Sequence, residues 1–121
     1  MRPEEFDRLV AEALEDLPEE ILRRLDNVAI TVADWPTRAE LRRANIPRGG
    51  TLFGLYEGVP LTKRTTHYGL VPPDKITLFR GPLLAFSRDP EELRAQIRRT
   101  IVHEIAHHFG MSEEDIRRLG Y

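Results

Sequence analysis

The chain has 121 residues, of which 40% are hydrophobic and 31% are charged, and its formal net charge is −2. This length fits a single domain over residues 1–121 with one core, and no apolar stretch approaches the roughly 18 residues that would cross a membrane. Acidic and basic residues are interspersed and cysteine is absent, which argues against a nucleic-acid surface and excludes a disulfide framework. The first residues lack the apolar segment of a secretion signal. We therefore expect a cytoplasmic protein without nucleic-acid or membrane partners, and favour a monomer.

The first part of the chain predicts two helices and a strand. Hydrophobic residues recur at helical spacing through residues 3–16, where a proline near the start suits a first helical turn. A second proline begins a shorter helical pattern over 18–25. The period then changes to two over 28–33, which is typical of a strand. Residues 36–50 are polar and end in proline and glycine, so they predict a loop with room for one helical turn.

The second part predicts two more strands and a long helix. Residues 51–58 and 75–81 are strand-like, and the connection between them is rich in proline and therefore irregular. Asp89, followed by proline and by a glutamate three residues on, has the pattern of a helix start. This helix is predicted to run to Phe109 and to stop at Gly110. The elements together indicate an α+β fold with a small sheet.

The end of the long helix reads HEIAH, residues 103–107. A spacing of i, i+4 places His103 and His107 on one helix face, outside the apolar arc, and lets both bind one zinc ion. Glu104 lies about 60° round from His107, where it suits a hydrogen bond to activated water better than a ligand role. The alternative is that both histidines are merely polar positions of an amphipathic helix. His108 projects among the core positions, so we expect it to pack or to support the site rather than bind metal.

A third ligand has to come from the few residues that follow. Gly110 can adopt a left-handed conformation that ends the helix and turns the chain back. Glu113 stands six residues after His107, which gives HExxHxxGxxE, the extended zinc-binding pattern of the metzincin type with an acid as its last member.

The acids of this last segment have competing interpretations. Ser112 predicts the N-cap of a final helix, and Asp115 at its third position would complete a capping box. Glu113 and Glu114 remain as ligand candidates, and Glu113 is favoured. Both could instead be acids that stabilise the first turn of a helix.

Several blocks of the chain resemble a small bacterial metallopeptidase-like family with a minimal zincin domain. The blocks are GLYEGVPLT (54–62), PDKITLFRGPL (73–83), HEIAHHFGMSEEDI (103–116) and the closing LGY. The resemblance implies a zincin-like fold in which a small mixed β-sheet packs against an HExxH active-site helix and N-terminal helices. It also implies a zinc ion held by His103, His107 and a downstream acid. Members of that family usually have aspartate at the position of Glu113.

These observations predict a zinc-dependent peptidase that acts on a peptide or protein, with Glu104 as the general base. The strand-like segment LFGLY (52–56) could bind substrate backbone by edge addition, or be an ordinary core strand. Candidates for stabilising an oxyanion are Arg64, His67, Tyr68 and Tyr121. One alternative is a catalytically silent zincin-fold interaction domain stabilised by zinc. A second, an arginine-rich nucleic-acid binder, is disfavoured by the interspersed acids.

Overall fold

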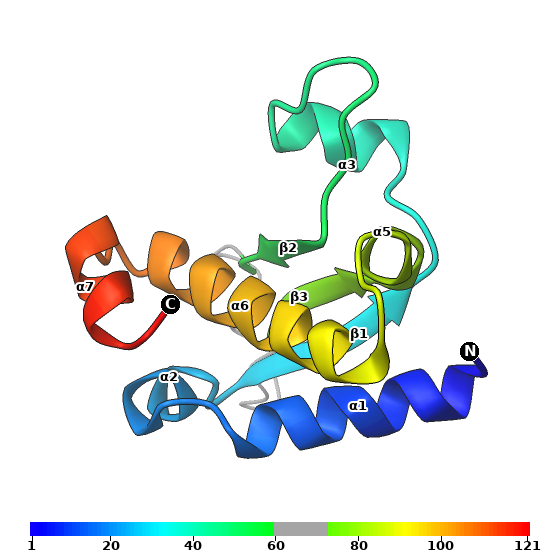
Figure 1. The fold of residues 1–121 in the computed structure, drawn as a ribbon. Coiled ribbons are helices and arrows are strands. Elements are labelled where there is room, and N and C mark those ends of the chain that lie inside the picture. The colour runs from blue at the N-terminus through cyan, green and yellow to red at the C-terminus, as the bar shows by residue number, and fades with distance from the viewer. Residues whose placement is uncertain (60–72) are drawn as a thin grey trace, which may run out of the picture.

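The computed structural model describes residues 1–59 and 73–121, and Figure 1 shows their arrangement. In chain order the elements are α1 (Pro3–Glu15), α2 (Glu19–Arg24), β1 (Val28–Ala33), α3 (Arg38–Arg43), β2 (Gly54–Glu57), β3 (Asp74–Phe79), α5 (Arg80–Ala85), α6 (Pro90–His108) and α7 (Glu113–Arg118). None of the helices in the described ranges is long and apolar enough to cross a membrane.

The described strands form a mixed sheet in the order β1-β3-β2. β1 runs parallel to β3, with Ile30 opposite Ile76, and β2 runs antiparallel to β3, with Tyr56 opposite Ile76. β3 is almost wholly buried, as expected for the central strand. β2 is therefore an edge strand of this sheet, and its outer side faces α6.

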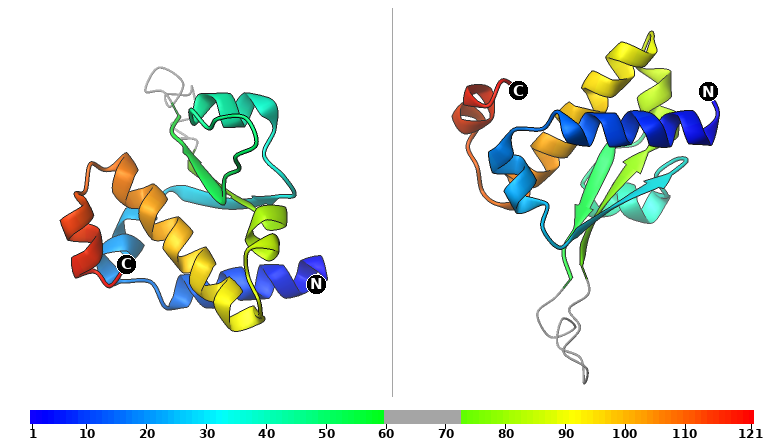
Figure 2. Two further views of the ribbon diagram at one scale, coloured as in Figure 1. Left: turned by 45° about the horizontal axis from the view of Figure 1, so that its top comes forward. Right: turned by 90° about the horizontal axis from the view of Figure 1, so that it is seen from below.

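The core lies between the sheet and the helices α1 and α6. α6 packs on β2 and β3, and α1 packs on α6. In Figure 1 and the left view of Figure 2, α6 lies between the sheet and α1, whereas α3 is on the far side of the sheet. The fully buried side chains of this core include Phe6, Ile21, Ile76, Leu78, Leu83, Ile97, Ile101, Val102, Ile105 and Ile116. This arrangement confirms the predicted α+β class with a small mixed sheet packed against the long helix.

Most predicted elements are confirmed within one or two residues. The helices predicted over 3–16 and 18–25 correspond to α1 and α2, and the strand over 28–33 is β1. The polar segment 36–50 contains more than a turn, since Thr37 and Glu40 form a capping box that starts α3. The strand predicted over 51–58 is shorter and comprises only β2.

The strand predicted over 75–81 is wrong at its end, because α5 begins at Arg80. Two contacts with the end of β1 turn the chain there. The backbone N–H of Gly81 donates to the carbonyl oxygen of Asp34 at 2.8 Å, and the Arg80 guanidinium pairs with the Asp34 carboxylate. Trp35 packs directly on Gly81, so closely that a Cβ there would lie 2.2 Å from the indole ring.

Candidate metal centre and active site

The helix that carries the histidines is defined at both ends by capping contacts. At its start the Asp89 carboxylate accepts a hydrogen bond from the backbone N–H of Glu92 at 2.8 Å. At its end Gly110 has a φ of +73°, and its N–H donates to the carbonyl oxygen of His107. The next N–H, of Met111, donates to the carbonyl oxygen of Ala106 at 2.8 Å. This pair of bonds is a Schellman motif, which reverses the chain directly after the histidines.

The reversed chain enters α7 through a second capping motif. The Ser112 hydroxyl accepts from the backbone N–H of Asp115, and the Asp115 carboxylate accepts from the N–H of Ser112. These hydrogen bonds hold the pKa of Asp115 below its usual value, and they confirm the capping role predicted for this residue. Ile116 is fully buried and anchors α7 to the core. Glu113, the first residue of α7, is consequently held beside the end of α6.

The structure brings three of the predicted site residues close together. The rings of His103 and His107 lie on one face of α6, with their centroids 5.7 Å apart and their planes at 82°. Nε2 of His107 is 3.2 Å from Oε1 of Glu113. Glu114 is exposed and has no hydrogen bond or ion pair with another described residue. Of the two acids left open by the sequence, Glu113 is the one that contacts a histidine.

The imidazole nitrogens and the carboxylate are of the types that bind zinc in proteins, but these side chains are not gathered around one point. Within residues 1–59 and 73–121, no group of three or more His, Cys, Asp or Glu side chains is placed closely enough to hold a metal. Two ligand atoms of a tetrahedral zinc lie about 3.3 Å apart, close to the separation of His107 and Glu113. Burial and the neighbouring His107 lower the pKa of His103. A lowered pKa favours the neutral imidazole, which is the form that binds a metal.

Glu104 projects from α6 toward the sheet. Its Oε1 accepts a hydrogen bond from the backbone N–H of Tyr56 in β2 at 2.9 Å. Burial raises the pKa of Glu104, while the Tyr56 N–H and His107 act in the opposite direction. A partly buried carboxylate with a raised pKa is a better proton acceptor than an exposed one. The position of Glu104 beside both β2 and the histidine pair suits the base role expected for it.

Behind Glu104 lies a polar cluster that the sequence analysis did not anticipate. The Tyr56 hydroxyl donates to Oδ2 of Asp74 at 2.6 Å, and Oδ1 of Asp74 accepts from the N–H of Val59 at 2.9 Å. The His108 ring stacks on the Tyr56 ring at a centroid distance of 3.8 Å. Asp74 is only 8% exposed. The cluster fixes β2 against β3 and the end of α6, and so fixes the N–H that holds Glu104.

The expected core position of His108 is wrong, and the residue after it is exposed as well. The side chain of His108 is 38% exposed, and Phe109 is 43% exposed. The last turn of α6 extends past the buried part of the sheet, where Tyr56 covers one side of His108 and Arg24 lies over the Phe109 ring at 4.9 Å. The supporting contact expected of His108 is present, but it lies at the surface.

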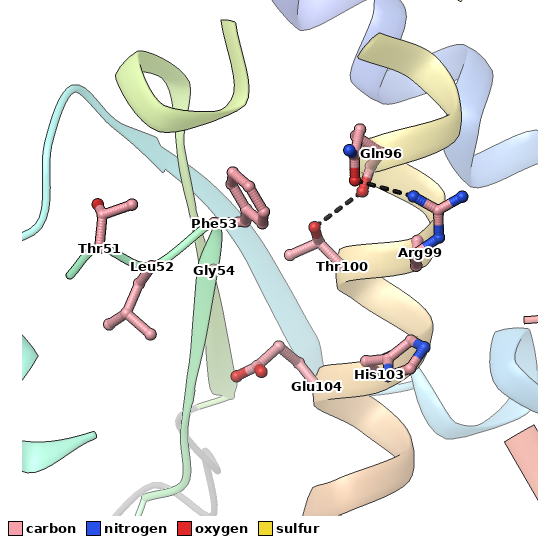
Figure 3. A pocket seen from close by; sticks show the side chains of 9 residues that line it. All are labelled: Thr51, Leu52, Phe53, Gly54, Gln96, Arg99, Thr100, His103 and Glu104. Carbon is pink, nitrogen blue, oxygen red and sulfur yellow. Dashed lines mark hydrogen bonds between the residues drawn. The ribbon is translucent and has the colours of Figure 1, made fainter. Parts of the chain in front are cut away.

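A pocket of about 300 Å³ lies beside Glu104, between α6 and the segment that leads into β2. Figure 3 shows its walls, with Glu104 projecting from the helix toward the strand. The lining residues are Thr51, Leu52, Phe53, Gly54, Gln96, Arg99, Thr100, His103 and Glu104. The pocket thus connects the base and one candidate ligand to the edge strand.

The oxyanion candidates Arg64, His67 and Tyr68 lie outside the described residues. Tyr121 follows α7 and is partly buried against the core, where its N–H donates to the carbonyl oxygen of Ile116. No hydrogen bond of the described residues joins the Tyr121 side chain to the histidine face.

Comparison with known families identifies the family of this chain. The sequence profile of the zincin-like metallopeptidases matches residues 25–121, from the end of α2 to the C-terminus. The chain belongs to this family. The match confirms the resemblance and the minimal zincin domain predicted from it. Helices α1 and α2 lie before the matched range.

The fold of this chain resembles that of a solved structure. A conserved hypothetical protein from Thermus thermophilus superposes with a TM-score of 0.56 and 24% sequence identity, covering 90% of this chain and 94% of its own. At that identity the likeness concerns the fold alone. A search of curated proteins gives no match.

Proposed function

We propose that this zincin-like domain hydrolyses peptide bonds with a zinc ion bound by His103, His107 and Glu113. The observation that carries the proposal is the position of Glu104, whose carboxylate is held between the histidine face of α6 and the edge strand β2. Bound zinc would polarise the scissile carbonyl and lower the pKa of a water molecule toward neutrality. Membership of the zincin-like family supports the choice of metal.

In this proposal Glu104 accepts the proton of the attacking water and then delivers it to the leaving amine. Burial raises the pKa of Glu104, which favours proton uptake. The N–H of Tyr56 orients the carboxylate through Oε1, which leaves the second oxygen for the water. The Tyr56 hydroxyl in turn donates to Asp74. Two successive hydrogen bonds, Asp74 with Tyr56 and Tyr56 with Glu104, therefore position the base.

The outer edge of β2 would bind the substrate backbone. The backbone of Phe53 faces β3, because its carbonyl oxygen accepts a hydrogen bond from the N–H of Phe79. The N–H of Tyr56 points the other way and donates to Glu104. Because backbone groups alternate along a strand, those of Gly54 share the outward direction of Tyr56. An extended peptide added there would lie beside the helix that carries the histidines.

A catalytically silent zincin-fold domain stabilised by zinc is the second candidate. It is favoured by the open arrangement of the donor side chains in the described residues, and by the hydrogen bond that already occupies one oxygen of Glu104. Such a domain would present the β2 edge and the pocket to a protein partner.

Cleavage of a peptide library separates the two candidates. The zinc-loaded protein is compared with the same protein after chelation, and products are identified by mass spectrometry. The peptidase proposal predicts cleavage that requires zinc and is restored when zinc is returned. Stoichiometric zinc without cleavage of any peptide would support the silent domain.

A further inference from the structure

One end of the pocket beside Glu104 carries a cation, Arg99, that lacks an anionic partner among the described residues. Arg99 lies on α6 one turn before His103, and its Nη1 donates to Oε1 of Gln96 at 3.0 Å. Within residues 1–59 and 73–121, no carboxylate forms an ion pair with Arg99. The neighbouring arginines Arg94 and Arg98 differ, because they pair with acids in and directly after α1.

The opposite wall of the pocket is largely apolar. It consists of Thr51, Leu52, Phe53 and Gly54, and Figure 3 shows the Phe53 ring on the side of this segment that faces α6. This wall packs closely on α6 at Gly54, since a Cβ there would lie 2.6 Å from Cγ2 of Thr100. The Thr100 hydroxyl donates to the carbonyl oxygen of Gln96 and is therefore satisfied. A ligand in this pocket meets apolar surface on one side and a guanidinium on the other.

The two charged groups of the pocket are well separated along the helix. Arg99 precedes Glu104 by five residues, which corresponds to about 7.5 Å of helix rise. A peptide whose reacting carbonyl lies at His103 and Glu104 would place its neighbouring residue toward Arg99. A carboxylate at that end would meet the guanidinium while staying away from the Glu104 carboxylate.

We propose that Arg99 recognises a carboxylate in the substrate, on the residue next to the bond that is cleaved. The inference rests on the proposed function and specifies its substrate class. A guanidinium offers a carboxylate two parallel N–H donors. Gln96 strengthens this choice, because its Oε1 accepts from Arg99 and leaves its amide N–H groups to donate to the same anion. The carboxylate is either an acidic side chain or a free C-terminus.

Peptide binding to the metal-free protein tests this inference without any need for turnover. The probes are alanine-based pentapeptides with a neutral fluorophore, carrying glutamate or glutamine at the fourth position and a free or amidated C-terminus. The four combinations separate the two sources of the carboxylate. Dissociation constants are measured by fluorescence anisotropy for the wild type, Arg99→Gln and Arg99→Glu. Arg8→Gln is the matched control, because Arg8 is an exposed arginine of α1, a helix that contributes no residue to the pocket lining.

The wild type should bind at least one carboxylate-bearing peptide about fivefold to tenfold more tightly than the neutral peptide. Arg99→Gln should remove this preference, Arg99→Glu should reverse it, and Arg8→Gln should retain it. Equal affinity for all four peptides, or a preference that survives Arg99→Gln, would overturn the inference. Thermal melting of each variant checks the fold, which should tolerate both changes because Arg99 is exposed.

Failure of the proposed function would give a different result. If no peptide is hydrolysed with zinc bound but the carboxylate preference depends on Arg99, the recognition site stands and the peptidase does not. If peptides are hydrolysed regardless of their acidic residues and C-terminus, the peptidase stands and the role of Arg99 is wrong.

Discussion

The carboxylate of Glu104 and the backbone N–H of Tyr56 are joined by a hydrogen bond of 2.9 Å, although the two residues are 48 positions apart. This bond connects the HExxH helix to the edge strand of the sheet. It holds Glu104, the base in our proposal, against the outer edge of β2.

The histidine pair is the first part of the site that mutation can test. His103→Ala and His107→Ala should each abolish binding of one zinc per chain, because each removes one of three ligands. Metal content after dialysis is the measurement. His108→Ala is the control, since His108 stacks on Tyr56 on another side of the helix, and it should retain zinc. Full zinc occupancy in His107→Ala would show that zinc does not bind at this face of α6.

The third ligand is tested by comparing two adjacent glutamates. Glu113→Gln should weaken zinc affinity much more than Glu114→Gln, because an amide is a poorer zinc ligand than a carboxylate and only Glu113 lies 3.2 Å from His107. Competition with a chelator of known affinity gives both constants. Equal losses would leave the ligand unassigned, and the opposite order would transfer it to Glu114.

The capping box of α7 should matter for both stability and metal. Ser112→Ala removes the hydroxyl that caps α7 and should lower the free energy of unfolding by about 1 kcal/mol. It should also weaken zinc affinity, because α7 holds Glu113 beside His107. Thr37→Ala is the matched control: it removes the same kind of cap from α3, on the far side of the sheet. A similar stability loss with unchanged zinc affinity is expected for this control.

The same cap predicts a pH dependence. The Ser112 contacts lower the pKa of Asp115 below its ordinary value of 3.8, so the folded state binds fewer protons than the unfolded state in that region. The stabilisation is therefore present above about pH 4 and is lost as the pH falls through the folded-state pKa. The free energies of unfolding of Asp115→Asn and the wild type, measured with urea, should differ at pH 7 and converge as the pH falls below the folded-state pKa. A constant difference across this range would contradict the linkage.

Close packing at Gly54 predicts a further effect. Gly54→Ala would push its Cβ within 2.6 Å of Cγ2 of Thr100 and within 3.2 Å of the carbonyl oxygen of Thr77. It should cost about 1–3 kcal/mol of stability and move β2 away from α6. Thr100→Ser removes that methyl group and should recover part of the loss in the double variant. Gly58→Ala, which meets its neighbours only at 3.4 Å or more, should be nearly neutral in thermal melts.

The helical period and the capping residues made α1 and α6 predictable from the sequence, as they did the N-cap roles of Asp89 and Ser112. Helix α5 was missed because no capping side chain marks its start. It begins where Asp34 and Trp35, more than 40 positions away, turn the chain after β3. Such contacts depend on the pairing of β1 with β3 and leave no local pattern.

The candidate site was predictable to a similar extent. The i, i+4 spacing identified the shared face of His103 and His107, and Gly110 identified the reversal that brings Glu113 back. The prediction for His108 used only its angle around the helix axis. It was wrong because the core does not cover the helix along its whole length. The contact of Glu104 with β2 could not be predicted, since it requires knowing which strand lies at the edge beside α6.

The most direct test of the account is the comparison of Glu104→Gln with the wild type. Glutamine retains an oxygen that can accept from the N–H of Tyr56, and no proposed ligand is altered, so zinc content and melting temperature should stay the same. Turnover of the best library peptide should fall by about a hundredfold to ten-thousandfold, because an amide cannot accept or deliver the proton. Unchanged turnover in Glu104→Gln, with zinc bound in both proteins, would contradict the assignment of Glu104 as the base.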